Sequence, residues 1–314
     1  MKYAFIFPGQ GSQHIGMGKE LYENFDAAKR VFDEVDEALK QNLYALMSDG
    51  SQAELTLTVN AQPAIMAVCM AVIRVLEKEF CIDLKNKVSF VAGHSLGEYA
   101  AACTSGVFDL ATTAKLLRLR GEAMQQAVPV GVGGMLAVLG LSFGEVDDLI
   151  EASSDENYFC VAANDNTEGQ VVLSGHLKAL QKAAEIAPEF GAKKAIMLPV
   201  SAPFHSPLMA PAVNIMNKAL QNAPSFEPKI ALISNVTATA TLSKAEIISN
   251  LEKQITGMVR FRETMLYLCA QNVTDIIEIG PGSVLSNMVK RSHKDIYTTS
   301  VETPSAIEEL AGNL

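Results

Sequence analysis

The sequence lacks a hydrophobic run long enough to span a membrane. Its longest apolar stretch, Ala64 to Leu76, is interrupted by Arg74 and is shorter than a bilayer requires. The N-terminal residues MKYAFIFPGQG lead directly into a glycine turn and contain no small-residue cleavage site, so they predict a strand and not a signal peptide. We therefore expect no membrane helix and no export signal.

Cysteines and basic residues are also few. The five cysteines are scattered, odd in number and free of C-x-x-C spacing, which argues against structural zinc and favours a reduced, cytoplasmic location. The 25 Lys and Arg are outnumbered by 35 Asp and Glu, which gives a net charge of −10. This charge argues against a general attraction to nucleic acid or anionic membrane, and an acidic partner would need a local basic patch.

The composition suits a globular enzyme, because 314 residues with 49% hydrophobic content can bury a large core. Strand patterns alternate with helical ones, which predicts a parallel sheet. The elements predicted for residues 1–127 are a strand from Lys2 to Phe7, a helix carrying Tyr22, Phe25 and Phe32, a helical region from Gln62 to Phe80, a strand from Val88 to Ala92, and a helix beginning near Asp109.

Residues 128–198 have a different pattern, with the order βαββαβ of a ferredoxin-like module. Its elements are strand 135–139, helix 143–152, strands 159–163 and 170–174, helix 177–189 and strand 194–198. Strands and helices then alternate again, at 230–234, 244–255, 261–269, 276–279 and 284–291. We therefore predict an α/β domain over residues 1–127 and 199–314 with an inserted ferredoxin-like subdomain over residues 128–198.

The motif Gly93-His94-Ser95-Leu96-Gly97 lies between the strand ending at Ala92 and a helical pattern. A G-x-S-x-G turn in this context is typical of a nucleophile elbow, in which glycines allow a sharp corner and the serine hydroxyl stands at its apex. Ser95 is therefore the candidate nucleophile. The amide of Leu96, at a helix N-terminus, could donate to an oxyanion.

The turn from Gly9 to Gly18 does not match a nucleotide-binding motif. G-x-G-x-x-G would need glycine at His14, and a P-loop would need Ser or Thr where Glu20 follows Gly18-Lys19. What remains is a tight turn at the carboxyl end of a strand, which is either structural or part of a ligand site.

Five histidines could serve as the base for Ser95. His205 is favoured because it lies in the segment VSAPFHSP, where Pro203 and Pro207 stiffen the loop and limit the freedom of the imidazole. His14 remains an alternative, while His94 is expected to point away and His176 and His293 to be solvated. No acidic residue lies within a dozen positions of His205, so the sequence leaves open a dyad oriented by a backbone carbonyl.

Arg120 lies beside the apolar stripe of the helix that begins near Asp109, whereas Lys115, Arg118 and Glu122 share a face that we expect to be solvated. A guanidinium on an apolar face needs an anion, because an unpaired buried charge is costly. Its partner is either an internal carboxylate or the carboxylate of a substrate held by two hydrogen bonds.

Six motifs occur in one order along the chain: PGQGSQ at Pro8 to Gln13, NAQPA at Asn60 to Ala64, GHSLGEYAA at Gly93 to Ala101, RGEAMQQAVP at Arg120 to Pro129, PVSAPFHSPLM at Pro199 to Met209, and EIGPG at Glu278 to Gly282. With them the chain resembles malonyl-CoA:acyl carrier protein transacylases from end to end. The resemblance implies the architecture inferred above, with a hydrolase-like parallel-sheet domain and a ferredoxin-like insertion.

The resemblance also implies roles for the candidate residues. Ser95 would be the acylated nucleophile and His205 its general base. Arg120 would bind the free malonyl carboxylate, and the backbone amides of Gln10 and Leu96 would form the oxyanion hole.

Three further residues match supporting positions of the family. The main-chain carbonyl of Gln254 would orient the histidine, Gln62 would line the acyl pocket, and the ring of Phe204 would leave little room for an α-methyl group. The chain departs from the family at 257–261, where Gly257, Met258 and Phe261 replace a frequent Asn-Pro and Trp. It also has Glu168 where proline is common, so we expect a local loop change there.

The expected reaction is a ping-pong transfer of malonyl from malonyl-CoA to the phosphopantetheine thiol of acyl carrier protein, for fatty acid synthesis and without a bound cofactor. The carrier is acidic as a family, so it should dock on a basic patch. The candidates are Lys193 and Lys194 in the insertion, and Lys290, Arg291 and Lys294 near the C-terminus.

Other functions share parts of this pattern. A serine thioesterase or acyl hydrolase would have the same elbow and histidine, a trans-acting acyltransferase of polyketide synthesis would have the same site, and a carrier-binding scaffold would need none of the chemistry. Arg120 favours a transferase over a hydrolase, because a hydrolase has no need of a buried cation beside its acyl pocket.

Overall fold

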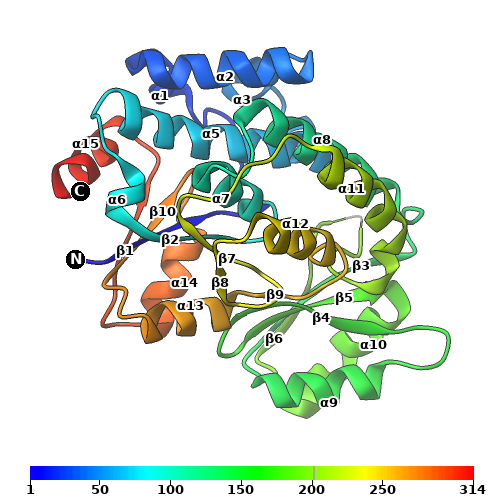
Figure 1. Ribbon diagram of the computed structural model, residues 1–314. Helices are drawn as coiled ribbons and strands as arrows, with labels where there is room; N and C mark the ends of the chain where they lie inside the picture. Colours follow the sequence, from blue (N-terminus) through cyan, green and yellow to red (C-terminus); the bar gives the residue numbers. More distant parts are fainter. Residues whose placement is uncertain (201) are drawn as a thin grey trace.

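The computed structural model describes residues 1–200 and 202–314, and its larger part is built on a six-stranded sheet (Figure 1). The strand order is β11-β10-β1-β2-β7-β8, and all pairings are parallel except the last. The strands are β1 (Tyr3–Phe7), β2 (Val88–Gly93), β7 (Ala231–Ile233), β8 (Ala240–Thr241), β10 (Asp275–Ile279) and β11 (Tyr297–Val301). This is the parallel sheet that the alternating pattern predicts.

Both faces of this sheet are covered, as its central strand β1 shows. Because side chains alternate along a strand, Phe5 and Phe7 enter the apolar cluster that contains α5, α7 and α8, while Ala4 and Ile6 enter the cluster formed with α13 and α14. The helices of this part are α1 (Lys19–Asn24), α2 (Asp26–Leu39), α3 (Leu43–Asp49), α4 (Gln52–Thr56), α5 (Thr58–Lys78), α6 (Leu84–Lys87), α7 (Gly97–Ser105), α8 (Leu110–Gln126), the 3₁₀ turn η2 (Pro207–Met209), α11 (Ala210–Asn222), α12 (Lys244–Lys253), α13 (Phe261–Ala270), α14 (Val284–Ser292) and α15 (Pro304–Asn313).

The second sheet is built mainly by the segment that the sequence predicts to be ferredoxin-like. Its order is β6-β3-β5-β4-β9, and the first four strands are antiparallel. Helices α9 and α10 cover one face, and their apolar side chains form a separate core with Leu136, Val138 and Leu173. The elements are β3 (Gly133–Leu139), α9 (Phe143–Ser153), β4 (Cys160–Thr167), β5 (Gln170–His176), α10 (Leu177–Ile186), the 3₁₀ turn η1 (Ala187–Phe190), β6 (Lys194–Met197) and β9 (Val259–Arg260).

The fold is thus α/β, with a parallel-sheet domain and an inserted ferredoxin-like module. Three strands were not predicted, namely β8 and β11 at the two edges of the larger sheet, and β9 in the second sheet. Strand β9 comes from the larger domain and pairs in parallel with β4, with Val259 opposite Asn164 and Arg260 opposite Asp165. The boundaries at residues 128 and 198 stay a prediction.

Two local expectations for the larger domain were wrong. The helix carrying Tyr22 and Phe32 is two helices, because Phe25 is extended and packs edge-on against Phe80. Arg118 is half-buried and not solvated, since it donates to Asn60 Oδ1 at 2.9 Å and to Gln41.

The longest apolar stretch, Ala64 to Leu76, is part of a 21-residue helix, α5. By length and composition α5 could cross a membrane, but 89% of its most apolar window is buried inside the protein. It packs between α2, α7 and α8 as a core helix.

Candidate active site

Ser95 stands at the corner between β2 and α7, with a left-handed φ of 54°. The corner depends on two glycines that flank it. A Cβ on Gly93 would lie 1.9 Å from the carbonyl carbon of Gly97, and a Cβ on Gly97 would lie 2.2 Å from the carbonyl oxygen of Phe7. Any side chain at either position would collide with backbone, so the sequence can fold into this corner only with glycine there.

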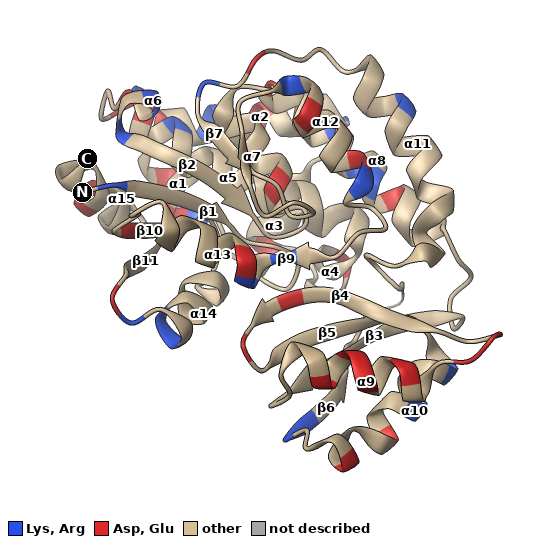
Figure 2. Ribbon diagram, turned by 60° about the horizontal axis from the view of Figure 1, so that its bottom comes forward, with Lys and Arg blue, Asp and Glu red and all other residues tan. Residues whose placement is uncertain are grey.

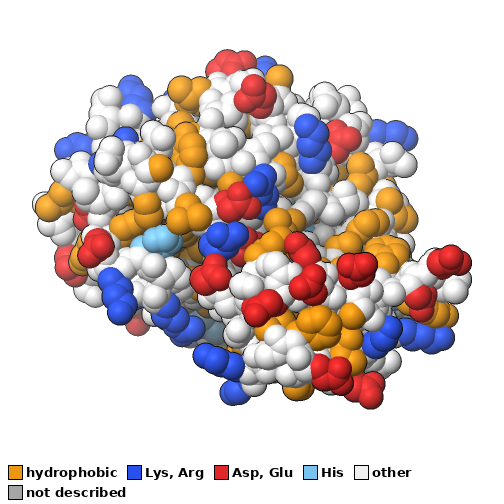
Figure 3. Space-filling view, turned by 90° about the horizontal axis from the view of Figure 1, so that it is seen from below, with side chains coloured by type: hydrophobic (Ala, Val, Ile, Leu, Met, Phe, Trp, Pro, Cys, Tyr) orange, Lys and Arg blue, Asp and Glu red, His pale blue; other side chains and the backbone are white. Residues whose placement is uncertain are grey.

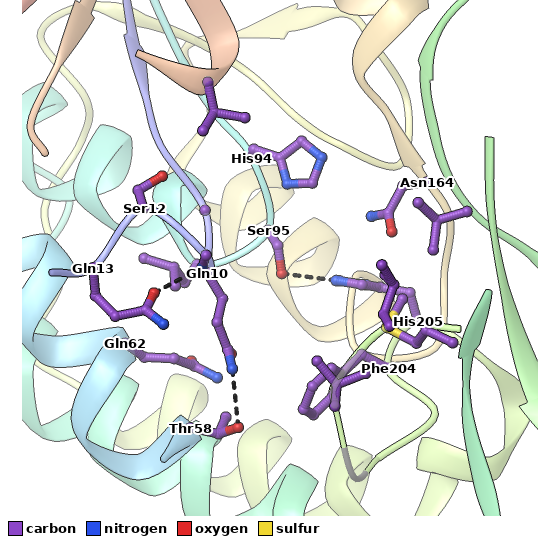
Figure 4. Close-up of a pocket in the computed structure, with 18 of the residues that line it drawn as sticks. Gln10, Ser12, Gln13, Thr58, Gln62, His94, Ser95, Asn164, Phe204 and His205 are labelled. Atoms are coloured by element: carbon purple, nitrogen blue, oxygen red, sulfur yellow. Dashed lines mark hydrogen bonds between the residues drawn. The ribbon is translucent and has the colours of Figure 1, made fainter. Parts of the chain in front are cut away.

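His205 meets Ser95 from the other side of the pocket, as Figure 4 shows. Its Nε2 lies 2.7 Å from Ser95 Oγ, and its Nδ1 lies 2.8 Å from the main-chain carbonyl of Gln254. Because a carbonyl oxygen only accepts, this contact fixes the tautomer with the proton on Nδ1 and leaves Nε2 free to accept the serine proton. His205 follows the segment 199–203, of which Ser201 lies outside the described residues.

The imidazole of His205 is held neutral by its surroundings. Burial, and after it the nearby positive charge of Arg120, lower its pKa to about 3, against the opposing effect of the hydrogen bond to the carbonyl of Gln254. A neutral imidazole is the form that can act as a base, so the pair is poised for proton abstraction at neutral pH.

Arg120, on α8, is 1% exposed and reaches the same hydroxyl. Its Nη2 donates to Ser95 Oγ at 3.0 Å and to Gln254 Oε1 at 2.9 Å, and its Nη1 donates to Gln62 Oε1 at 2.8 Å. Within residues 1–200 and 202–314 it forms no salt bridge. The guanidinium therefore has neutral partners and no directly bound anion.

Two residues that the sequence analysis missed, Glu98 and Asn235, belong to the hydrogen-bond network that supports the elbow. Asn235 Oδ1 accepts from the amide of Ser95 at 2.8 Å, and its Nδ2 donates to the carbonyl of Gly93 at 2.5 Å. The side chain of Gln254 donates to the Ser95 carbonyl at 2.9 Å and to Glu98 Oε2 at 2.7 Å. A buried acid directly after the elbow was the only local signal, since Asn235 lies 140 residues away along the chain.

The amides of Gln10 and Leu96 lie beside the nucleophile, in turns at the ends of β1 and β2. In the described part of the chain neither N–H has a hydrogen-bond acceptor, whereas the amide of Gly11 donates to Gln13 Oε1 at 2.7 Å. The Gln10 side chain is turned away toward Thr58, with Nε2 3.3 Å from Oγ1 (Figure 4). Two unpaired amides beside a nucleophile can stabilise a developing oxyanion.

The pocket has a volume of about 560 Å³ and lies between the two sheets. Gln62 and Phe204 line it, as the sequence predicts, together with Ser95, His205, Arg120, Gln10 and Leu96. Its far wall is the uncovered face of the second sheet, with Met135, Ala137, Asn164 and Val172. Met288, from α14, lines it as well.

The other histidines have partners elsewhere. His94 Nε2 is 2.8 Å from Asn166 Oδ1, so it faces the insertion and not Ser95. His14 Nε2 is 2.8 Å from Glu302 Oε1. His176 and His293 are not solvated as expected, because both are half-buried. His176 packs against Phe159, and His293 lies beside Cys269. Among the described residues, no three His, Cys, Asp or Glu side chains are grouped so that they could hold a metal ion.

An elbow serine, a carbonyl-oriented histidine and a pocket walled by two subdomains suit chemistry through an acyl-serine ester. The chain belongs to the acyl transferase family, whose domain model matches residues 4–314. The resemblance inferred from the motifs is confirmed by curated relatives named malonyl CoA-acyl carrier protein transacylase. That of Bacillus subtilis (strain 168) is 44% identical over 98% of this chain and 95% of the relative. That of Haemophilus influenzae is 38% identical over 98% of both.

Solved structures give the same result. An acyl-carrier-protein-S-malonyltransferase from Bartonella henselae is 50% identical and superimposes with a TM-score of 0.96, covering 99% of this chain and 100% of the other. A malonyl-transacylase solved with a type II polyketide synthase acyl-carrier protein is 33% identical, with a TM-score of 0.95 and complete coverage of both chains.

Proposed function

We propose that this protein moves the malonyl group from malonyl-CoA to the phosphopantetheine thiol of acyl carrier protein, in the cytoplasm and in support of fatty acid synthesis. The observation that carries this proposal is the guanidinium of Arg120, which is buried, lacks a bound carboxylate in the described residues, and lies 3.0 Å from Ser95 Oγ. A buried cation beside the nucleophile fits an acyl group that carries its own carboxylate.

In the first half-reaction, Ser95 Oγ attacks the thioester carbonyl of malonyl-CoA as its proton passes to His205 Nε2. The amides of Gln10 and Leu96 donate to the oxyanion, and a single such donor typically contributes about 10²- to 10³-fold in rate. The C–S bond then breaks, the sulfur of coenzyme A takes the proton from the imidazolium, and the malonyl group remains as an ester on Ser95.

In the second half-reaction, the pantetheine thiol of the carrier gives its proton to His205 and its sulfur attacks the ester. The C–O bond breaks, Ser95 Oγ recovers the proton, and malonyl leaves on the carrier. The carbonyl of Gln254 holds the imidazole in one tautomer throughout, in the place that a carboxylate takes in a catalytic triad.

Gln62, Gln254 and Phe204 favour a malonyl group over other acyl groups. Gln62 and Gln254 accept hydrogen bonds from Arg120 and so aim its guanidinium at the space beside Ser95. The ring of Phe204, buried against the same pocket, leaves little room for an α-methyl group.

We place the carrier on a groove of about 660 Å³ between the insertion and the larger domain. Lys193 and Arg291, which belong to the two halves of the candidate basic patch, line this one groove. Gln170 lines both the groove and the pocket of Ser95, so the two adjoin. Figure 2 locates basic residues on α14 of the larger domain and at β6 of the insertion. Seen from below, Lys and Arg form a run at the lower left (Figure 3).

Lys194, Lys290 and Lys294 are exposed and lie close in sequence to Lys193 or Arg291, which line the groove. We include them in the basic patch. An acidic carrier docked here could extend its pantetheine arm past Gln170 toward Ser95. Because the rest of the chain is acidic, this local charge would also orient the encounter.

The experiment that tests the function compares Arg120→Ala with Arg118→Ala, a matched change two residues earlier on α8, where the side chain binds Asn60 away from Ser95. Loss of Arg120 should lower kcat/KM for malonyl-CoA by about 10²-fold or more, because a buried charge pair is lost, and should shift preference toward acetyl-CoA. Arg118→Ala should keep malonyl selectivity. Unchanged selectivity in Arg120→Ala would refute the assignment, and release of free malonate without carrier would favour the hydrolase.

A further inference from the structure

Glu98 is a buried acid that the transfer steps do not use. It lies in the first turn of α7, three residues after Ser95, and is 0% exposed. Its Oε2 accepts from Gln254 Nε2 at 2.7 Å and from the amide of Asn235 at 3.1 Å. Its Oε1 is buried and makes no hydrogen bond of normal geometry in the described part of the chain, although the hydroxyl of Ser234 lies near the carboxyl group. One oxygen of this carboxyl group is therefore available to carry a proton.

A single amide joins Glu98 to Arg120. Gln254 Oε1 accepts from Arg120 Nη2 at 2.9 Å, while Nε2 of the same side chain donates to Glu98. The reverse orientation would set N–H groups against the guanidinium and an oxygen against the carboxylate, so the amide is fixed by the two charges. Guanidinium and carboxylate are thus two ends of one buried hydrogen-bonded chain.

The charges around this chain are few. Arg120 from α8 is the cation that acts on Glu98, and Tyr99 and His205 are the other titratable groups that act on or respond to Arg120. Strand β7 and the residues after it present neutral Ser234 and Asn235, and the segment after α12 presents neutral Gln254. Burial raises the pKa of Glu98 to about 7 against the opposing effects of its hydrogen bonds and of Arg120, so both protonation states are accessible near neutral pH.

We propose that Glu98 is the counter-charge of Arg120 in the free enzyme, and that it takes up a proton when the carboxylate of the acyl group pairs with Arg120. This inference rests on the proposed function, which supplies that carboxylate. With Glu98 ionised, the buried pair is neutral, and a second carboxylate would leave one uncompensated negative charge. Two carboxylates that share one cation in a buried site cannot both stay ionised, so the proton goes to Glu98.

The inference has a pH dependence of definite sign. Because binding takes up a proton, the affinity for a malonyl group should fall as pH rises above about 7, by up to about tenfold per pH unit. An acetyl group brings no carboxylate, so its affinity should not change with the state of Glu98. Glu98 would thereby make selectivity for the charged acyl group depend on pH.

The test is calorimetric titration of Ser95→Ala, which binds but cannot be acylated, with malonyl-pantetheine and acetyl-pantetheine. Both lack the phosphates of coenzyme A. Titrations in two buffers of different ionisation enthalpy give the protons taken up per ligand bound. We expect about one proton for malonyl-pantetheine near pH 8, none near pH 5.5, and none for acetyl-pantetheine at either pH. Malonyl binding without proton uptake near pH 8 would overturn the inference.

A second variant assigns the proton. Ser95→Ala with Glu98→Gln should bind malonyl-pantetheine without proton uptake, and uptake that persists would assign the proton to another group such as His205. Should this variant not fold, infrared difference spectra of Ser95→Ala decide, because only Glu98 uptake produces a protonated carboxyl band in the protein on malonyl binding. If instead Arg120→Ala binds malonyl- and acetyl-pantetheine as the parent does, the proposed function fails and not this linkage alone.

Discussion

His205 can act as a base only while its imidazole is neutral, and its surroundings secure this state. Burial and the positive charge of Arg120 lower the pKa of His205 to about 3. The unfolded chain has an ordinary histidine pKa of about 6.5 and so binds a proton first as pH falls. This histidine therefore lowers stability progressively as pH drops from about 6.5 toward 3, and it has no effect on stability above that range.

Removal of the neighbouring cation should reverse part of this shift. We predict that Arg120→Gln raises the pKa of His205, because the repulsion that disfavours imidazolium is lost while burial remains. Arg118→Gln, on the same helix but directed at Asn60, should leave it unchanged. Histidine side-chain NMR titrations measure both. A pKa of His205 that is the same in the two variants would show that Arg120 does not act on the base.

Single residues with a strong local pattern were predictable. The glycine turn predicts Ser95, the stiffened loop favours His205 over His14, and the apolar face singles out Arg120. The structure brings these three side chains together, and their catalytic roles stay a prediction. Glu98 was not identified, because its link to Arg120 runs through the side chain of Gln254, which lies 156 residues away in the chain. No local sequence pattern predicts where that side chain lies. Arg118 was misjudged for the same reason, since helical spacing does not show that Gln41 and Asn60 cover it.

The β2–α7 corner positions the nucleophile. Its shape depends on the close approach of backbone to Gly93 and Gly97 more than on any contact of the Ser95 side chain. We predict that Gly93→Ala destabilises the protein by about 3 kcal/mol or more, because its Cβ would lie 1.9 Å from backbone that cannot move without breaking the elbow. The measurement is the free energy of unfolding in urea.

The matched control is Gly144→Ala in α9, where a Cβ would meet nothing within 4 Å. That change should be neutral or stabilise by up to about 1 kcal/mol, because alanine favours a helix. Equal effects at the two glycines would contradict the steric account of the corner.

The elements themselves were largely predictable because strands and helices differ in hydrophobic period. The βαββαβ order gave the second sheet down to its strand limits within a few residues. Strand β9 was missed because Val259 and Arg260 are too short a run to show alternation, and they pair with β4 through a contact about 95 residues distant in the chain. The break at Phe25 was missed because an aromatic residue fits a helical stripe as well as it fits a turn.

The whole molecule works as two subdomains that enclose one pocket. They are joined by an ion pair between buried Asp165 of β4 and half-buried Arg262 of α13, with Arg262 Nη2 2.8 Å from Asp165 Oδ2. Their relative placement could not be predicted from the sequence, because it depends on side chains that meet across the two sheets. The same placement brings Lys193 and Arg291 to one groove.

Charge reversal in this groove should separate the two half-reactions. We predict that Lys193→Glu with Arg291→Glu raises KM for the acidic carrier by about tenfold, and that added salt weakens the difference, while malonylation of Ser95 keeps its rate. Arg30→Glu, exposed on α2, is the matched control and should change neither step. An equal loss in both half-reactions would place the carrier elsewhere.

The central claim is that Ser95 holds a malonyl group between two thiols, and mass spectrometry of the intact protein tests it most directly. The protein is mixed with malonyl-, methylmalonyl- or acetyl-CoA, and carrier is added afterwards. We predict one adduct with malonyl-CoA, absent in Ser95→Ala, stable in water, discharged when carrier is added, and much reduced with the other two donors. An adduct that hydrolyses without carrier, or that forms equally in Ser95→Ala, would contradict the account.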